Sequence, residues 1–101
     1  IPAYTAAFYV RAGRVPLIPY HPSGSHSLHL AVEAKATDYH VLLLRQHGLL
    51  VSGANMTESL GIVEEIEQCC QISLVSAMKG GWLTEAQCQE IDQDLGRTWK
   101  N

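Results

Sequence analysis

The sequence lacks long hydrophobic runs and carries little net charge. None of its apolar stretches approaches the roughly 18 residues that a membrane-spanning helix needs, so no membrane partner is expected. The net charge is −3, from interspersed acidic and basic residues. No basic stripe of the kind that binds a phosphate backbone is present, which argues against nucleic acid as a partner.

Cysteine is scarce and odd in number. The three are Cys69, Cys70 and Cys88. Neighbouring positions on a helix point about 100° apart, which suits neither a disulfide nor a shared metal ion. We therefore predict buried or half-buried thiols in a reducing, cytoplasmic compartment rather than a disulfide framework. No signal peptide is visible, and a first residue of Ile1 is what an internal start would give.

The chain has the size and composition of one domain at most. It holds 101 residues, of which 47% are hydrophobic. Such a length can bury a core, although with little margin.

Apolar patterning and turn residues predict three strands and three helices. Prolines are tolerated in an edge strand but not in a central one. Ser25 follows a turn sequence and suits a helix N-cap, whereas Asn55 with Glu58 and Thr84 with Gln87 have the spacing of capping boxes. The predicted order is an edge strand at 15–20, a helix at 26–36, a hairpin with strands at 40–45 and 49–52, a long helix from 55 to the glycines at 80 and 81, and a short helix from 84 to 95.

The same patterning predicts the fold class. Both hairpin strands are almost continuously apolar, which predicts that helices cover both faces of the sheet. Apolar residues at three- and four-residue spacing predict the core stripe of the long helix. That stripe comprises Leu60, Val63, Ile66, Cys70, Leu74 and Ala77. We therefore expect an α/β fold, with a mixed or antiparallel sheet covered by helices.

His47 stands out among the five histidines. It interrupts two apolar strands and precedes Gly48, which supplies a close approach or an unusual backbone angle at the turn. A histidine at a strand end can project into a cleft, although a core histidine bonded to backbone groups is the alternative. His26 and His29 could share a helix face, but no further ligand stands at a suitable spacing, which favours a solvated face.

Residues 41–51 (VLLLRQHGLLV) resemble the C-terminal half of the class II aldolase and adducin domain. In that family the histidine before this glycine is the last of three zinc ligands, so the resemblance implies that His47 is a metal ligand. The other two form an upstream His-x-His pair, which this sequence lacks. The resemblance covers nearly all of the chain and implies that residues 1–101 are the C-terminal portion of one such domain.

Segments 1–5 (IPAYT) and 11–17 (RAGRVPL) look most like the bacterial 3-oxo-tetronate 4-phosphate decarboxylase group. The resemblance implies a lyase that uses Zn²⁺ or another divalent metal and decarboxylates a small phosphorylated sugar acid. The metal would chelate substrate oxygens and stabilise an enediolate. It also implies a homo-oligomer, such as a tetramer, in which an aromatic residue from a neighbouring subunit helps to close the site. Tyr4 and Tyr9 fall near that segment, and Tyr4 is our candidate catalytic residue, with plain packing as the alternative.

Several other functions share these sequence features. Sugar-phosphate aldolases, 4-epimerases and dehydratases of the same family have the same His-Gly turn. Adducin-like domains keep the fold, lose the metal ligands and serve assembly. An unrelated small α/β interaction module is a further alternative. With one ligand of three, the 101-residue chain alone is expected to be inactive.

Overall fold

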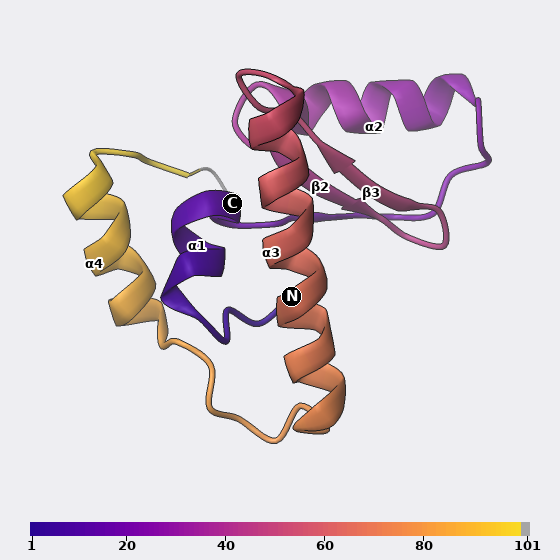
Figure 1. Cartoon of the computed structure of the whole chain (residues 1–101). Helices are drawn as coiled ribbons and strands as arrows, with labels where there is room; N and C mark the ends of the chain where they lie inside the picture. The colour runs from indigo at the N-terminus through magenta and orange to yellow at the C-terminus, as the bar shows by residue number, and fades with distance from the viewer. Residues whose placement is uncertain (100–101) are drawn as a thin grey trace.

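Four helices and three short strands make up residues 1–99, the part of the chain that the computed structural model describes. Figure 1 shows their arrangement, with α3 running the height of the molecule beside α1. The elements are α1 (Ala6–Ala12), β1 (Leu17–Ile18), α2 (His26–Ala36), β2 (Val41–Leu44), β3 (Gly48–Val51), α3 (Met56–Val75) and α4 (Glu85–Leu95).

The three strands form one mixed sheet in the order β1-β2-β3. β1 runs parallel to β2, with Leu17 beside Leu43, while β2 and β3 form an antiparallel hairpin that pairs Leu44 with Gly48. The mixed sheet is one of the two predicted alternatives, and the edge position of the first strand is as predicted. β1 is only two residues long because a proline stands on each side of it, and a proline has no N–H to donate to a ladder.

Helices cover both faces of β2. Val41 lies in a core with α1, α3 and α4, whereas Leu42 and Leu44 lie in a second core under α2. This alternation follows from the pleat of a strand, which turns successive side chains to opposite faces. The prediction of a helix-covered sheet is confirmed for β2.

β3 does not fit the prediction that both strands are covered on both faces. Gly48 and Leu50 are exposed and Leu49 and Val51 are half-buried, so one face of β3 is open to solvent. The apolar sequence alone does not reveal that one face of β3 is exposed, because a strand in the middle of a sheet and a strand at its edge can have equally apolar sequences.

α1 is an element that the sequence analysis did not predict. Thr5 caps it, with its hydroxyl accepting from the Phe8 N–H at 3.1 Å, and Gly13 ends it at φ 63°. The helix is seven residues long and buries Phe8, Tyr9 and Ala12. Its aromatic residues are weak helix formers, so packing rather than propensity holds it.

The predicted core stripe of α3 is correct at Ile66 and in part at Cys70, which is half-buried against the core, and is otherwise wrong. The buried face of α3 is Ile62, Ile66, Cys69 and Ser73, which packs mainly on α1. Leu60 and Leu74 are exposed instead. Both stripes have helical spacing, and only the location of α1 decides between them.

The predicted end of α3 is also wrong. The helix stops at Val75 with Ser76 as its cap, before the glycine pair. Ala77 and Met78 both take left-handed φ angles near 55°, which ends the helix without a glycine.

The remaining helix boundaries agree with the prediction. Ser25 and Asn55 accept from backbone N–H groups three residues ahead, and Thr84 and Gln87 form a complete capping box. Gly96 ends α4 in the left-handed region. These signals are local, which is why the sequence carries them.

Two further expectations concern the cysteines and the membrane. All three cysteines are free, two of them buried and Cys70 half-buried, as predicted. Among the described residues, no helix is both long and apolar enough to cross a membrane.

Candidate metal-ligand site at the hairpin tip

His47 lies in the loop that joins β2 to β3. Its backbone N–H donates to the Leu44 carbonyl at 3.0 Å, closing a tight turn over 44–47. Gln46 has a φ of 54° and Gly48 a φ of 153°. A Cβ at Gly48 would meet no atom within 4 Å. The glycine is therefore needed for its backbone angle and not for a close approach.

The imidazole of His47 is exposed at this tip. Within residues 1–99, no group of three or more His, Cys, Asp and Glu side chains lies close enough together to hold a metal ion. A catalytic zinc usually takes three protein ligands and keeps one open position. The described residues therefore fit one ligand position, and the other donors would have to come from elsewhere.

The two histidines of α2 form part of a solvated surface. His26 and His29 share a face of α2 with ring centroids 6.0 Å apart, and His29 Nε2 lies 3.2 Å from the Glu33 carboxylate. The side chains of His29 and Glu33 are both about two-thirds exposed. Such a pair contributes little on a helix surface, in keeping with the solvated alternative.

Tyr4 precedes α1 and Tyr9 lies within it, and Figure 1 shows α1 apart from the loop that joins β2 to β3. Tyr4 packs edge-on against Trp82 and accepts a hydrogen bond from Ser76 Oγ at 3.1 Å. Tyr9 is 3% exposed, and its hydroxyl donates to Asp92 Oδ2 at 2.8 Å. Within this chain both tyrosines make packing contacts, and His47 lies near neither of them.

Asp92 is the centre of a buried polar network that the sequence analysis missed. Its carboxylate accepts from Tyr9, from Arg97 Nε at 2.9 Å and from Trp99 Nε1 at 2.8 Å. Burial by itself raises the pKa of Asp92, but hydrogen bonds from Arg97, Trp99 and Tyr9 outweigh burial and hold the pKa below its ordinary value. Burial and the bond to Asp92 raise the pKa of Tyr9. One acidic residue in a polar helix sequence gives no sign of such a network.

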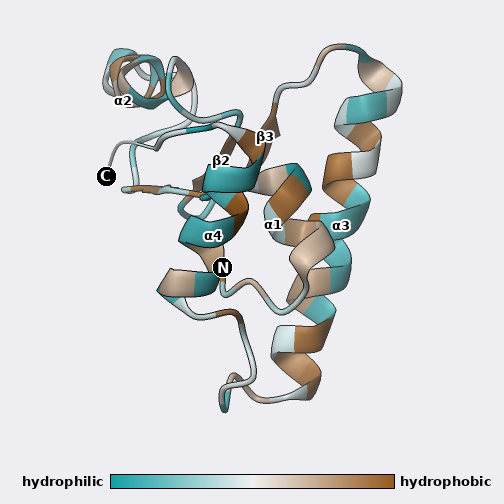
Figure 2. Ribbon diagram, turned by 90° about the vertical axis from the view of Figure 1, so that its left-hand side faces the viewer, coloured by the Kyte–Doolittle hydropathy of each residue, from teal (hydrophilic) through white to brown (hydrophobic). Residues whose placement is uncertain are grey.

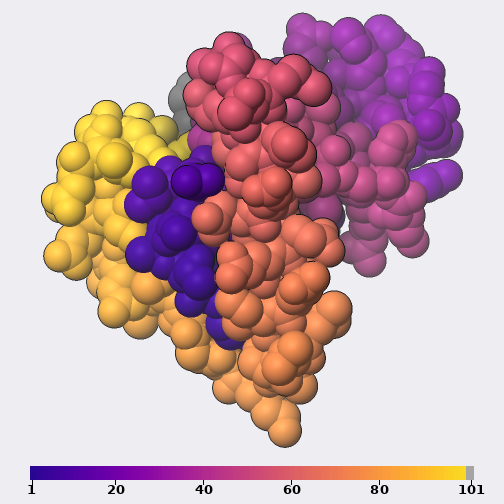
Figure 3. Space-filling view, viewed as in Figure 1, coloured from indigo at the N-terminus to yellow at the C-terminus, as the bar shows by residue number. Residues whose placement is uncertain are grey.

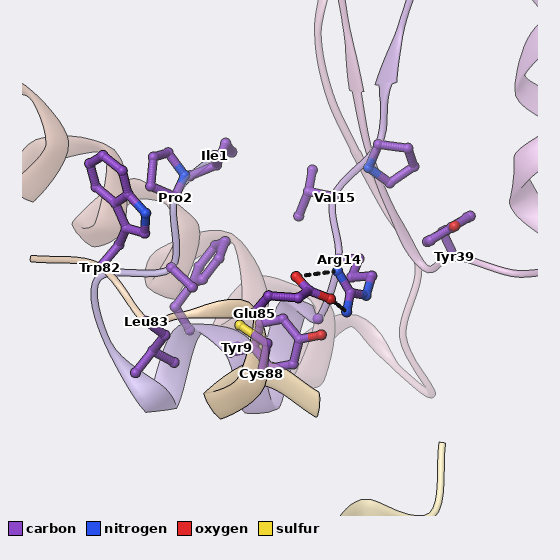
Figure 4. A pocket seen from close by; sticks show the side chains of 14 residues that line it. Ile1, Pro2, Tyr9, Arg14, Val15, Tyr39, Trp82, Leu83, Glu85 and Cys88 are labelled. Atoms are coloured by element: carbon purple, nitrogen blue, oxygen red, sulfur yellow. Dashed lines mark hydrogen bonds and ion pairs between the residues drawn. The ribbon is translucent and has the colours of Figure 1, made fainter. Parts of the chain in front are cut away.

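A cleft of about 560 Å³ opens beside this network, between the start of the chain, α1 and α4 (Figure 4). Arg14 forms a two-pronged ion pair with Glu85 at its wall. The hydrogen bond from Arg14 lowers the pKa of Glu85, and burial raises the pKa of Cys88. No histidine lines this cleft, so it is separate from the hairpin tip.

Comparison with known proteins decides the family. A profile described as the Class II Aldolase and Adducin N-terminal domain matches residues 1–74, a span that includes the hairpin and His47. The chain belongs to the class II aldolase and adducin family.

Relatives in this family include enzymes with different reactions. The chain is 24% identical over 93 residues to a 3-oxo-tetronate 4-phosphate decarboxylase of Haemophilus influenzae, covering 91% of this chain and 44% of that protein. It is 29% identical over 58 residues to a rhamnulose-1-phosphate aldolase of Listeria welshimeri, covering 57% of this chain and 21% of that protein.

A solved structure gives the same picture of the fold. The crystal structure of YgbL from Klebsiella pneumoniae, described as an aldolase, epimerase or decarboxylase, superposes with a TM-score of 0.82 and 27% identity. The match covers 90% of this chain and 44% of that one. The chain thus has a class II aldolase-like fold and spans less than half the length of the relatives that it matches.

Proposed function

We propose that this chain is one part of a metal-dependent carbon–carbon lyase, with His47 as a metal ligand. The proposed reaction is the decarboxylation of a 3-oxo-tetronate 4-phosphate, with Zn²⁺ or another divalent metal as cofactor. The observation that carries the proposal is an exposed histidine fixed at the tip of a hairpin, inside the segment that the family profile matches. The decarboxylase relative supports the choice of substrate class.

The hairpin gives His47 the properties that a ligand needs. The β2–β3 ladder and the bond from His47 N–H to Leu44 fix the backbone on both sides of the imidazole. Because the side chain is exposed and carries no hydrogen bond or ion pair in the described chain, it is available to bind a metal. When bound, the metal would supply Lewis-acid chemistry at substrate oxygens.

A sugar-phosphate aldolase is the second candidate, favoured by the Listeria relative. Both proposed reactions use a metal ion held by the same histidine, so His47 has the role of a metal ligand in either. The proposal further takes the functional form to be a cytoplasmic homo-oligomer, such as a tetramer, as the family resemblance implies. In that form Tyr4 remains the residue predicted to contribute to a neighbouring subunit's site.

His47→Ala tests the ligand assignment. In the protein purified from its natural source, this change should remove most of the bound metal and most of the activity. The circular dichroism spectrum should stay unchanged, because an exposed loop residue does not contribute to the core. Intact mass, metal content by mass spectrometry and carbon dioxide release from 3-oxo-tetronate 4-phosphate are the measurements. A mass near 11.1 kDa would predict no activity even in the wild type, since one donor does not make a site.

His29→Ala is the matched control, because it also removes an exposed histidine and should leave metal content unchanged. An unaltered metal content in His47→Ala would rule out His47 as a ligand. Retained metal binding with activity on a sugar phosphate but not on the 3-oxo acid would favour the aldolase.

A further inference from the structure

The first residues of the chain are held against the C-terminal half of α3 and the loop that follows it. Cys69 Sγ donates to the Pro2 carbonyl at 3.0 Å, and the Leu83 N–H donates to the Ala3 carbonyl at 2.8 Å. Figure 2 shows from the side that the start of the chain runs between α4 and α3, and in Figure 3 the indigo atoms of the first residues and α1 fill the space between these helices. The backbone that leads into Tyr4 is therefore fixed before α1 begins.

The side chain of Tyr4 is held by the same part of the molecule. Its ring packs against Trp82 with centroids 5.7 Å apart and an interplanar angle of 82°. Such an edge-on pair is a favourable arrangement of two aromatic rings. The hydroxyl of Tyr4 accepts from Ser76 Oγ at 3.1 Å. The ring and the hydroxyl of this half-buried side chain are thus each fixed by a separate partner.

Ser76 has one hydroxyl proton and two acceptors within reach. Its Oγ lies 3.1 Å from the Tyr4 hydroxyl and 3.2 Å from the Ser73 carbonyl oxygen. That carbonyl also accepts from the Met78 N–H at 3.0 Å, so it keeps a partner when the Ser76 hydroxyl turns away from it. Because a serine hydroxyl rotates to suit its acceptors, Ser76 can direct its proton to Tyr4 without leaving a buried group unpaired.

The turn that follows Ser76 has a strained backbone. Ala77 and Met78 both have left-handed φ angles near 55°, which residues with a side chain adopt only at a cost. Strain of this kind collects at functional sites. The matching family profile ends at residue 74, so Ser76 and Trp82 follow the segment that family membership accounts for.

We propose that Ser76 and Trp82 are positioning residues for Tyr4, and that Ser76 donates to the Tyr4 oxygen when Tyr4 gives up its proton. This inference rests on the proposed function, in which Tyr4 contributes to a neighbouring subunit's site. Cleavage of a carbon–carbon bond leaves an electron pair on the substrate that must take up a proton. The O–H bond of Tyr4 breaks, the proton passes to the substrate, and the electron pair stays on the phenolic oxygen. The Ser76 hydroxyl turns from the Ser73 carbonyl to that oxygen and stabilises its charge. Water returns a proton to Tyr4 after the product leaves.

Ser76→Ala tests the hydrogen bond to Tyr4. The variants are made in the protein as its natural source assembles it, and carbon dioxide release from 3-oxo-tetronate 4-phosphate is measured. Ser76→Ala should lower kcat about tenfold, the worth of one hydrogen bond to a charged oxygen, and change KM less than about twofold. Ser76→Thr keeps the hydroxyl and should keep most of the wild-type kcat. Ser59→Ala removes a half-buried hydroxyl near the other end of α3 and should leave kcat unchanged.

A second set of variants shows whether Ser76 acts through Tyr4. In a Tyr4→Phe background, Ser76→Ala should cause no further loss of kcat, because no phenolic oxygen is left to receive the bond. Trp82→Ala should lower kcat in the native background, and Trp82→Phe, which keeps an aromatic edge, should recover part of the loss. Equal losses from Ser76→Ala with and without the Tyr4 hydroxyl would overturn the proposal, because Ser76 would then act on the fold alone.

The same assays separate a failure of this inference from a failure of the proposed function. If the wild type is an aldolase, the variants are compared on the sugar phosphate that it cleaves. An active wild type whose kcat is unaffected by Ser76→Ala would overturn the positioning roles alone. A wild type that releases no carbon dioxide and cleaves no sugar phosphate would overturn the proposed function, and the positioning roles with it.

Discussion

At the scale of single residues, Gly48 acts through its backbone rather than its size. Its φ of 153° lies in a region that side-chain-bearing residues rarely adopt, while a Cβ would find open space there. The sequence allows either a close approach or an unusual backbone angle at Gly48, and the structure supports the second.

Gly48→Val should therefore destabilise the chain by about 2 kcal/mol through strain alone, because a β-branched residue resists this φ. The measurement is urea denaturation followed by circular dichroism. Leu50→Val in the same strand is the control and should cost less than about 1 kcal/mol, since Leu50 is exposed. A Gly48→Val protein as stable as the wild type would mean that the turn relaxes without cost.

Asp92 is a residue whose ionised form holds several segments together. Replacing it by alanine should lower the free energy of unfolding by about 3 kcal/mol, because Arg97 would lose its buried partner. Asp94→Ala, at an exposed position of the same helix, should have little effect. Equal effects of the two changes would show that the network adds no stability.

The lowered pKa of Asp92 also predicts a pH dependence. Since the folded-state pKa lies below the unfolded value of about 3.9, the carboxylate stabilises the fold fully above that value. This stability is lost as pH falls through the folded-state pKa. Urea denaturation between pH 7 and pH 3 should therefore show a steeper acid loss in the wild type than in Asp92→Asn. Parallel curves would exclude this role.

At the scale of elements, α3 shows why periodicity alone did not locate the core. Ile66 is 3% exposed and Leu60 59% exposed, although both belonged to the predicted stripe. In the 101-residue chain, Ile66→Ala should cost about 3 kcal/mol, and Leu60→Ala less than about 0.5 kcal/mol. Urea denaturation of the two variants checks this, and a large cost for Leu60→Ala would mean that this face is already covered.

The caps were predictable because each is encoded within four residues. Ser25, Asn55 and Thr84 all accept the N–H bonds that their sequences predict. The Thr5 cap of α1 uses the same interaction and could have been found, but the helix that follows is too short for a clear period. The solvent exposure of one face of β3 and the choice of the buried face of α3 depend on neighbours distant in sequence. No local pattern therefore reveals them.

At the scale of the whole molecule, Trp99 packs the C-terminal segment against residues distant in the sequence. Its ring stacks on Tyr39 at 5.4 Å between centroids, and its Nε1 bonds Asp92. It also fills the space beside Gly13, where a Cβ would collide with the indole. The C-terminal segment thus packs against the end of α1 and the start of β2.

Trp99→Ala should lower the free energy of unfolding by about 3 kcal/mol, because it removes a large packed ring and one bond to Asp92. Trp82→Ala, at a more exposed tryptophan (42%), should cost clearly less. Thermal unfolding of both variants is the measurement. A larger loss for Trp82 would contradict the assigned role of Trp99.

The sequence by itself determined the hairpin, most helix boundaries, the α/β class and His47 as the candidate ligand. The hairpin and the helix boundaries rest on residues that interact within a few positions, where capping, turn and alternation rules apply, whereas the role of His47 rests on the family resemblance of residues 41–51. Only the tertiary structure decided which stripe of α3 is core, that β3 is open on one face, and that Asp92 gathers Tyr9, Arg97 and Trp99. These features arise from contacts between segments as many as 83 residues apart, and the energy of such contacts depends on how the chain packs rather than on any local pattern.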